Sequence, residues 1–320
     1  MTDNTFPEDL SNNPLLQEFN TPLGTPPFDA LENHHFLPAI KEGIKEARAQ
    51  VEDIATASAQ PSFSNTVEAL EAVGEKLEAS AEIFFNLLSA ETNPELQELA
   101  QEVSPLLTAY QNDIALDPRL FQRVEAVWKQ KQNLDLDEEQ QELLRQTYQS
   151  FVRNGARLPE DKQEQLRHMD EKLAKLSLQF GDNVLAETNA YALYLNADEV
   201  EGLPESALEA AREDAEAHEQ PGKYRISLQM PSFIPFMTYA RRRDLREKLF
   251  RAYGRKAFQG NENDNREIVL QIARLRYQRA QLLGFENHAD YSLQERMAGS
   301  TQQVHRFLDE LLDPALPAAR

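Results

Sequence analysis

Apolar residues recur at alternating steps of three and four positions along most of this chain. The first clear run consists of Phe36, Ile40, Ile44, Ala47, Val51 and Ile54. On a helix with 3.6 residues per turn, this spacing places all the apolar side chains on one side. Most of the segments that follow have the same periodicity, so the sequence predicts an all-α fold of long antiparallel helices.

Capping signals divide the pattern into separate helices. Polar residues that precede a proline directly, or a Glu or Gln by three positions, are typical of helix N-caps. Four such residues are Asn65, Asn93, Asp117 and Asp137. We expect the helix that starts at Asn65 to continue to Leu88. Apolar residues from Leu166 to Val184 predict a longer helix of about 25 to 30 residues, enough to cross a domain.

The only β signal comes from two short segments, residues 191–195 and 224–228. The second alternates apolar and polar residues with a period of two, which is typical of a strand. A short acidic helix from Pro204 to His218 is expected between them. We therefore predict one small two-stranded antiparallel ribbon.

Residues 231–299 are expected to form two long amphipathic helices joined by a polar break at residues 260–265. Four arginines lie within the predicted apolar faces: Arg242, Arg246, Arg276 and Arg279. A buried arginine is costly unless a carboxylate pairs with it. We interpret the four as structural ion-pair candidates; the alternative is that some line a channel for a charged ligand. If Arg246 or Arg276 is buried and paired, alanine there should cost a few kcal/mol.

Composition limits the possible partners. The 320 residues include 54 acidic and 33 basic side chains, a formal charge of −21. This charge repels phosphate backbones and anionic lipids, so we expect neither nucleic-acid nor membrane binding. The chain has no cysteine, which excludes disulfides and thiolate metal sites. No apolar run approaches the roughly 20 residues that a membrane helix needs, and a cytoplasmic protein is predicted.

Several longer motifs resemble those of the thimet oligopeptidase family of zinc metallopeptidases, and most of all its peptidyl-dipeptidases and oligopeptidase A. They are PSFSNTVEALE at 61–71, FVRNGARL at 151–158, NVLAETNA at 183–190, RRRDLRE at 241–247, DNREIV at 264–269 and LLGFENHADY at 282–291. The resemblance covers nearly the whole chain. It implies the N-terminal helical half of a zincin-type oligopeptidase. Residues 1–27 are rich in Pro, Asn, Thr and Asp, which predicts an extended leader, and we expect helical subdomains at residues 28–158 and 159–320.

The zinc motif of this class, HExxH, is absent. Two histidines one helical turn apart are needed for both rings to reach one metal. The six histidines, at positions 34, 35, 168, 218, 288 and 305, include no pair four residues apart. HEQPG at 218–222 begins like the motif, but Pro221 would break the helix. We therefore predict no catalytic and no metal-binding residue in this chain, and substrate-binding residues are not identified.

The resemblance implies a channel-wall half of an enzyme that hydrolyses short peptides, either as a peptidyl-dipeptidase or as an oligopeptidase. Zinc is expected in the full-length enzyme, whose catalytic half would follow residue 320, and none is expected in this fragment, which should be inactive alone. The face that the catalytic half covers in the family could then support self-association. The alternative is a non-catalytic, all-helical protein-interaction module.

Overall fold

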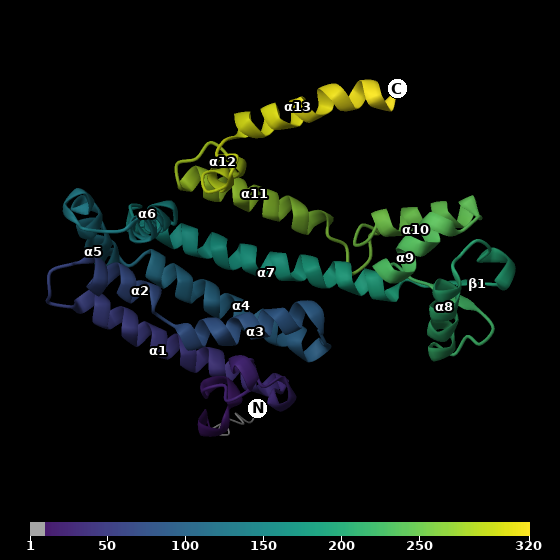
Figure 1. Cartoon of the computed structure of the whole chain (residues 1–320), viewed down its shortest axis with the longest axis horizontal. Helices are drawn as coiled ribbons and strands as arrows, with labels where there is room; N and C mark the ends of the chain where they lie inside the picture. Colours follow the sequence, from purple (N-terminus) through teal and green to yellow (C-terminus); the bar gives the residue numbers. More distant parts are fainter. Residues whose placement is uncertain (1–9) are drawn as a thin grey trace. The chain divides into compact units, whose positions relative to one another are not determined.

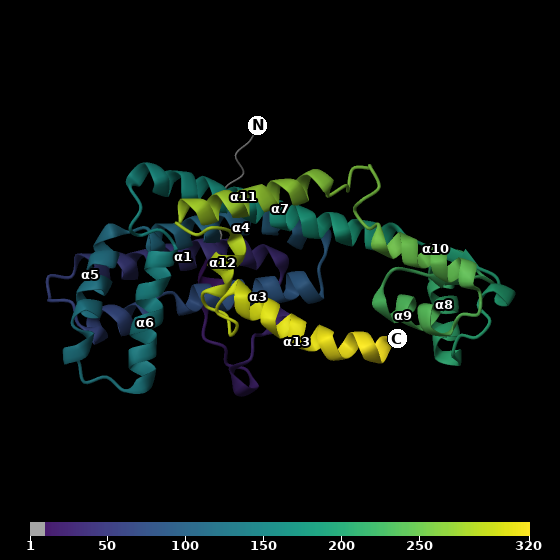
Figure 2. The same cartoon turned by 90° about the horizontal axis from the view of Figure 1, so that it is seen from above.

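The computed structural model describes residues 10–320 (Figures 1 and 2), so the first nine residues of the predicted leader lie outside the described part. The helices are α1 (Phe36–Thr56), α2 (Ala69–Glu71), α3 (Glu75–Ala90), α4 (Pro94–Ala115), α5 (Pro118–Lys129), α6 (Glu138–Arg153), α7 (Glu160–Ala190), α8 (Glu205–Ala217), α9 (Met230–Tyr239), α10 (Arg243–Gly254), α11 (Arg266–Leu282), α12 (His288–Leu293) and α13 (Thr301–Ala319). The predicted all-α class is confirmed. Within residues 10–320, no helix has both the length and the apolar character needed to cross a bilayer.

The chain divides into two compact units. The first runs to Lys175 and also contains Arg274–Arg320, and the second is Leu176–Ala273. Helix α7 contributes residues to both units, and so does α11. The subdomain boundary expected at residues 158 and 159 stays a prediction.

The described part of the leader attaches to the first unit through a short 3-10 turn at Pro14–Leu16. Asn13 caps this turn, since its Oδ1 accepts a hydrogen bond from the Leu15 N–H at 3.0 Å. Its Nδ2 donates to the His35 carbonyl at 2.8 Å. Leu15 is 3% exposed. The leader is therefore fixed beside the start of α1.

The core of the first unit forms where α1 packs against α3 and α4, which lie side by side in Figure 1. The predicted apolar stripe of α1 is buried from Phe36 to Val51, and Ile54 is half-buried. Val51 also joins a cluster with Phe121 of α5 and Phe151 of α6. The sequence pattern thus identified the packed side of α1.

Three of the predicted N-caps are confirmed. The side chains of Asn93, Asp117 and Asp137 accept hydrogen bonds from backbone N–H groups in the first turns of α4, α5 and α6, at 2.9, 2.7 and 2.9 Å. Each bond satisfies a donor that the helix itself leaves unpaired. These caps fix where the three helices begin.

The predicted start of the second helix is wrong. Ser62 is the N-cap there and Asn65 is its capping-box partner, with the two side chains accepting from each other's N–H at 3.1 and 2.9 Å. The helix is also interrupted before α3, where Gly74 has a left-handed φ of 81°. The Gln50 side chain accepts the Gly74 N–H at 3.0 Å. At this break, the Gly74 N–H therefore bonds to a side chain of α1 and not to a carbonyl of its own helix.

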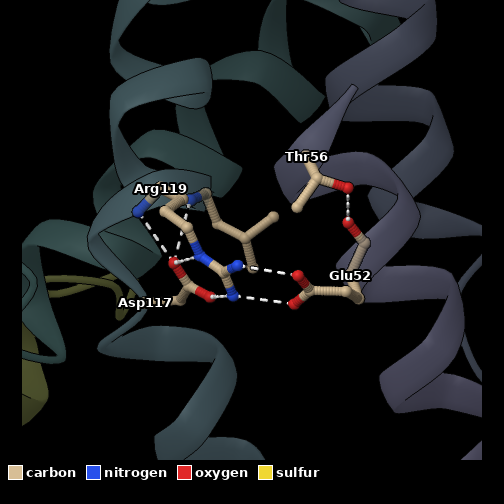
Figure 3. A network of polar contacts seen from close by, with 5 residues as sticks. Glu52, Thr56, Asp117 and Arg119 are labelled. Atoms are coloured by element: carbon tan, nitrogen blue, oxygen red, sulfur yellow. Dashed lines mark hydrogen bonds and ion pairs between the residues drawn. The ribbon is translucent and has the colours of Figure 1, made fainter. Parts of the chain in front are cut away.

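An arginine joins α1 to the first turn of α5 (Figure 3). Arg119 donates from both terminal nitrogens to the two Glu52 carboxylate oxygens, each at 2.8 Å. It also donates to Asp117 Oδ2 at 2.8 Å. Asp117 thus both caps α5 and orients the guanidinium that reaches α1.

The second unit contains the predicted ribbon. Strands β1 (Leu193–Leu195) and β2 (Tyr224–Ile226) pair antiparallel, with Leu193 opposite Ile226, and they form the only sheet within residues 10–320. Helices α8, α9 and α10 cover the buried side of the ribbon through a core that includes the fully buried Phe236 and Leu249.

The first of the two long helices predicted for residues 231–299 is instead two helices, α9 and α10. The chain leaves helical geometry at Ala240, where ψ is 131°. The next N–H, of Arg241, donates to the Glu201 carbonyl at 2.9 Å. Gly202 permits this approach, because a Cβ at that position would lie 2.4 Å from the Tyr239 carbonyl oxygen. A long-range backbone contact thus ends α9.

The predicted polar break at residues 260–265 is present and is attached to the second-unit part of α7. Glu187 is 8% exposed and accepts hydrogen bonds from the amides of Gln259, at 2.8 Å, and Asn261. Asn265 is also buried, and its Nδ2 donates to the Phe180 carbonyl at 3.0 Å. The loop is therefore held by buried polar side chains.

Candidate functional site

The four candidate arginines lie in two pairs, because Arg242 and Arg246 belong to the second unit and Arg276 and Arg279 to the first. Arg242 is the N-cap residue of α10 and forms an exposed ion pair with Asp244 at 2.7 Å. Arg246 donates to the backbone carbonyls at the end of α9. Arg246 thus connects α10 to the end of α9, whereas the Arg242 pair lies within the first turn of α10.

Arg276 and Arg279 differ in exposure. Arg276 is exposed on α11 and forms no ion pair with any residue of 10–320. The Arg279 side chain is 13% exposed and pairs with Asp170 of α7, which is 15% exposed, through an Nε to Oδ1 bond of 2.6 Å. Burial alone would lower the pKa of Arg279, but the hydrogen bond and charge of Asp170 outweigh burial and raise it. Arg279 is therefore the candidate around which a site can be built.

Two guanidinium groups lie close to the ring of one tyrosine beside this pair. The Cζ atoms of Arg153 and Arg279 lie 4.6 and 4.9 Å from the Tyr291 ring centroid, within the range of cation–π attraction. The Tyr291 hydroxyl donates to Asn154 Oδ1 at 3.3 Å. The backbone carbonyl of Tyr291 accepts from Arg153 Nη2 at 2.9 Å. Arg153 also pairs with Glu295. These contacts hold α12 against α6 and α11.

The Arg279 and Asp170 pair lines a pocket of about 440 Å³ between α4, α6, α7 and α11. Its wall also includes the hydroxyl residues Thr108 and Ser150 and the amide residue Asn154. Because the guanidinium and carboxylate neutralise each other, the pair gives the pocket no net charge. The arrangement can accommodate an uncharged polar group, and it contains no group placed for nucleophilic attack.

His288 lies at the edge of the same cluster. It is the first residue of α12, whose N-cap is Asn287. Its ring stacks on Tyr291 with centroids 6.1 Å apart. Burial, followed by the charges of Arg276 and Arg279, lowers the pKa of His288.

No group of three or more His, Asp or Glu side chains in residues 10–320 lies close enough together to bind a metal ion. His34 and His35 are neighbours in one 3-10 turn, where His35 Nδ1 accepts the Glu32 N–H at 3.0 Å. His168 and His305 are exposed.

Sequence reasoning missed Asp170, Arg153 and Tyr291. Asp170 lies 109 residues before Arg279, and among 54 carboxylates no local signal distinguishes it. Tyr291 ends the LLGFENHADY motif, so the resemblance marked its segment without giving it a role. The position of Arg279 on the predicted apolar face was the one usable signal.

The sequence comparisons define the class of protein. Residues 40–163 match the family model described as the N-terminal domain of neurolysin and thimet oligopeptidase, and residues 236–320 match the model of peptidase family M3. Together with the relatives below, these matches show that the chain belongs to the M3 family of peptidases and corresponds to its N-terminal region.

The relatives are dipeptidyl carboxypeptidases and oligopeptidases A. Dipeptidyl carboxypeptidase of Escherichia coli is 35% identical over 309 residues, which is 96% of this chain and 45% of that protein. Oligopeptidase A of E. coli is 33% identical over 95% of this chain and 45% of its own length. The probable cytosolic oligopeptidase A of Arabidopsis thaliana is 33% identical over 96% of this chain. The chain thus spans somewhat less than half the length of these relatives.

Proposed function

We propose that this chain is the N-terminal, channel-wall half of a zinc metallopeptidase that hydrolyses short peptides, as a peptidyl-dipeptidase or an oligopeptidase. The observation that carries the proposal is the similarity to such peptidases along 96% of the chain. The named activities of the relatives belong to proteins more than twice as long. We further propose a cytoplasmic location, supported by the cytosolic assignment in the name of the Arabidopsis relative.

Peptidases of this family are in general zinc enzymes, but the residues of this chain do not fit a catalytic zinc ion. The sequence contains no HExxH, and residues 10–320 form no metal-binding group. We therefore assign no catalytic step to this chain and propose that it is inactive alone. The role left to it is structural: Arg279, Asp170 and Tyr291 hold α6, α7, α11 and α12 together as a stiff wall.

We also propose that copies of this chain associate through α13. This helix exposes an apolar stripe in which each side chain is 46–60% exposed: Phe307, Leu308, Leu311, Leu312 and Leu316. The steps of three and four place these residues on one side of the helix. Exposed apolar stripes of this kind favour association. In Figures 1 and 2, α13 extends from α12 without lying along α11.

The test compares two proteins. The purified 320-residue chain, incubated with zinc and a quenched fluorescent short peptide, should bind no stoichiometric zinc and release no product. The polypeptide produced from the intact gene should contain HExxH, bind one zinc ion and cleave the same peptide. If the intact product lacks both the motif and the activity, the non-catalytic helical interaction module replaces the peptidase proposal.

A further inference from the structure

The chain's single tryptophan forms an aromatic platform at the end of α5. Trp128 stacks on Tyr148 of α6, with ring centroids 4.5 Å apart and planes inclined by 6°. The opposite face of the indole does not carry another ring. Instead, Lys131 Nζ lies 3.4 Å from the indole centroid. A tryptophan face attracts cations through its quadrupole, and this one already holds a cation.

Lys131 reaches the indole without help from a carboxylate. It follows α5 in a 3-10 turn, its side chain is exposed, and it forms no ion pair within residues 10–320. The neighbouring Lys129, by contrast, pairs with Glu125 at 2.8 Å. The aromatic face alone therefore positions the Lys131 ammonium group.

Trp128 and Lys131 form one wall of a groove of about 590 Å³. Leu134 and Leu136, both half-buried, give the groove an apolar side. Glu138, in the first turn of α6, also lines it, is exposed, and has no ion-pair partner in the part of the chain that the structure describes. Glu142 and Arg145 line the groove as well and pair with each other, so they add no net charge. The groove thus combines a cation-binding aromatic face, apolar contacts for a methylene chain and a free carboxylate.

We propose that this groove binds a basic side chain, above all an arginine, presented by a segment of a partner protein. The guanidinium would replace the Lys131 ammonium on the Trp128 face and pair with Glu138. Arginine suits this geometry better than lysine, because its planar guanidinium stacks on aromatic faces and is less strongly hydrated. The chain's charge of −21 attracts such cationic partners. Lys131 is then a built-in competitor that sets the affinity.

Trp128 also provides the readout, because all tryptophan fluorescence of this chain comes from it. The probe is acetyl-Arg-Ala-Arg-amide, titrated at low salt, and the control is the same peptide with citrulline in place of arginine, which keeps the shape without the charge. We expect a saturable emission change with the arginine peptide that is weakened by added salt, and none with the citrulline peptide. Equal responses, or no saturation, would overturn the proposal.

Three variants test the roles of individual residues. Lys131→Ala removes the competitor and should tighten binding about two- to fivefold, the worth of an exposed cation–π contact. Lys129→Ala removes the same charge two residues away and should leave binding nearly unchanged. Glu138→Gln should weaken binding. If both lysine variants change the affinity equally, only general electrostatics is at work and the proposed groove is wrong; an unchanged Glu138→Gln contradicts it independently.

Discussion

Arg279 Nε donates a 2.6 Å hydrogen bond to Asp170 Oδ1 across 109 residues of sequence, and both side chains are largely buried. This one bond connects α11 to α7 and completes the wall of the pocket beside Tyr291. Of the four arginines singled out in the sequence, Arg279 is the one that joins helices far apart in the chain through a buried ion pair.

Breaking this pair should be strongly destabilising. Arg279→Ala leaves the Asp170 carboxylate buried and unpaired, which costs about 3 to 5 kcal/mol of unfolding free energy. Arg276→Ala, three residues away and exposed, should change it by less than about 0.5 kcal/mol. Urea denaturation of both variants provides the comparison. Replacing both partners with apolar residues should restore most of the loss; equal effects of the two alanine substitutions would contradict the assigned burial.

Asp117 should contribute stability in two separable ways. Burial alone would raise its pKa, but hydrogen bonds from the Arg119 side chain and from two backbone N–H groups together lower it. A lowered carboxyl pKa gives stability that is present above the unfolded-state value of about 4 and is lost as the pH falls through the folded-state value. Asp117→Asn keeps the cap but removes this pH dependence.

Asp117→Ala removes the cap as well as the charge, and should cost about 1 kcal/mol more than Asp117→Asn at pH 7. Thermal unfolding at pH 7 and pH 3 separates the two contributions. If the asparagine variant unfolds at the same temperature as the alanine variant, the cap contributes nothing to stability and this account is wrong.

His288 should titrate below the ordinary value of 6.5. A lowered histidine pKa means that the unfolded chain binds a proton first, so acidification below pH 6.5 destabilises the fold until the folded-state pKa is reached. NMR titration of the ring measures the pKa directly. Arg276→Ala should raise the pKa without a comparable change in stability, and a value of 6.5 or more in the unmodified chain would be inconsistent with the surroundings described.

Gly202→Ala should be among the most damaging glycine substitutions. Its φ of 101° disfavours any side chain, and a Cβ would lie 2.4 Å from the Tyr239 carbonyl oxygen. We expect the free energy of unfolding to fall by at least about 1 to 2 kcal/mol because of the backbone conformation alone. Gly222→Ala is the matched control, because its φ is 81° but no atom lies within 4 Å of the added Cβ. The excess loss at Gly202 measures the steric contact.

The apolar face of α13 should control self-association. The proposal predicts that the mass measured by sedimentation rises with protein concentration. Leu311→Glu places a charge in the centre of the exposed stripe, so this rise should weaken or vanish in the variant. Arg306→Gln, on the opposite side of the helix, should leave it unchanged. A chain that remains monomeric at high concentration without any substitution would rule out this role.

Local signals predicted much of the fold because they act over a few residues. The caps at Asn93, Asp117 and Asp137 required only the neighbouring sequence, and so did the two separate strands of the ribbon. The break after Tyr239 was missed because its cause, the bond from Arg241 to the Glu201 carbonyl, joins segments 40 residues apart. Asp170 was missed for the same reason: which of many carboxylates meets Arg279 depends on how α7 and α11 pack.

The anchoring of the 260–265 loop has a consequence for the ageing of this protein. Glu187 is a buried carboxylate whose described partners, Gln259 and Asn261, are neutral amides that act as donors. Spontaneous hydrolysis of the Asn261 amide would convert its donor into a second carboxylate facing the first. Two adjacent negative charges repel and cannot both remain ionised at low cost. One deamidation event would therefore turn one attachment of the loop into a repulsion, and the bond from Asn265 to the Phe180 carbonyl of α7 would have to hold the loop against it.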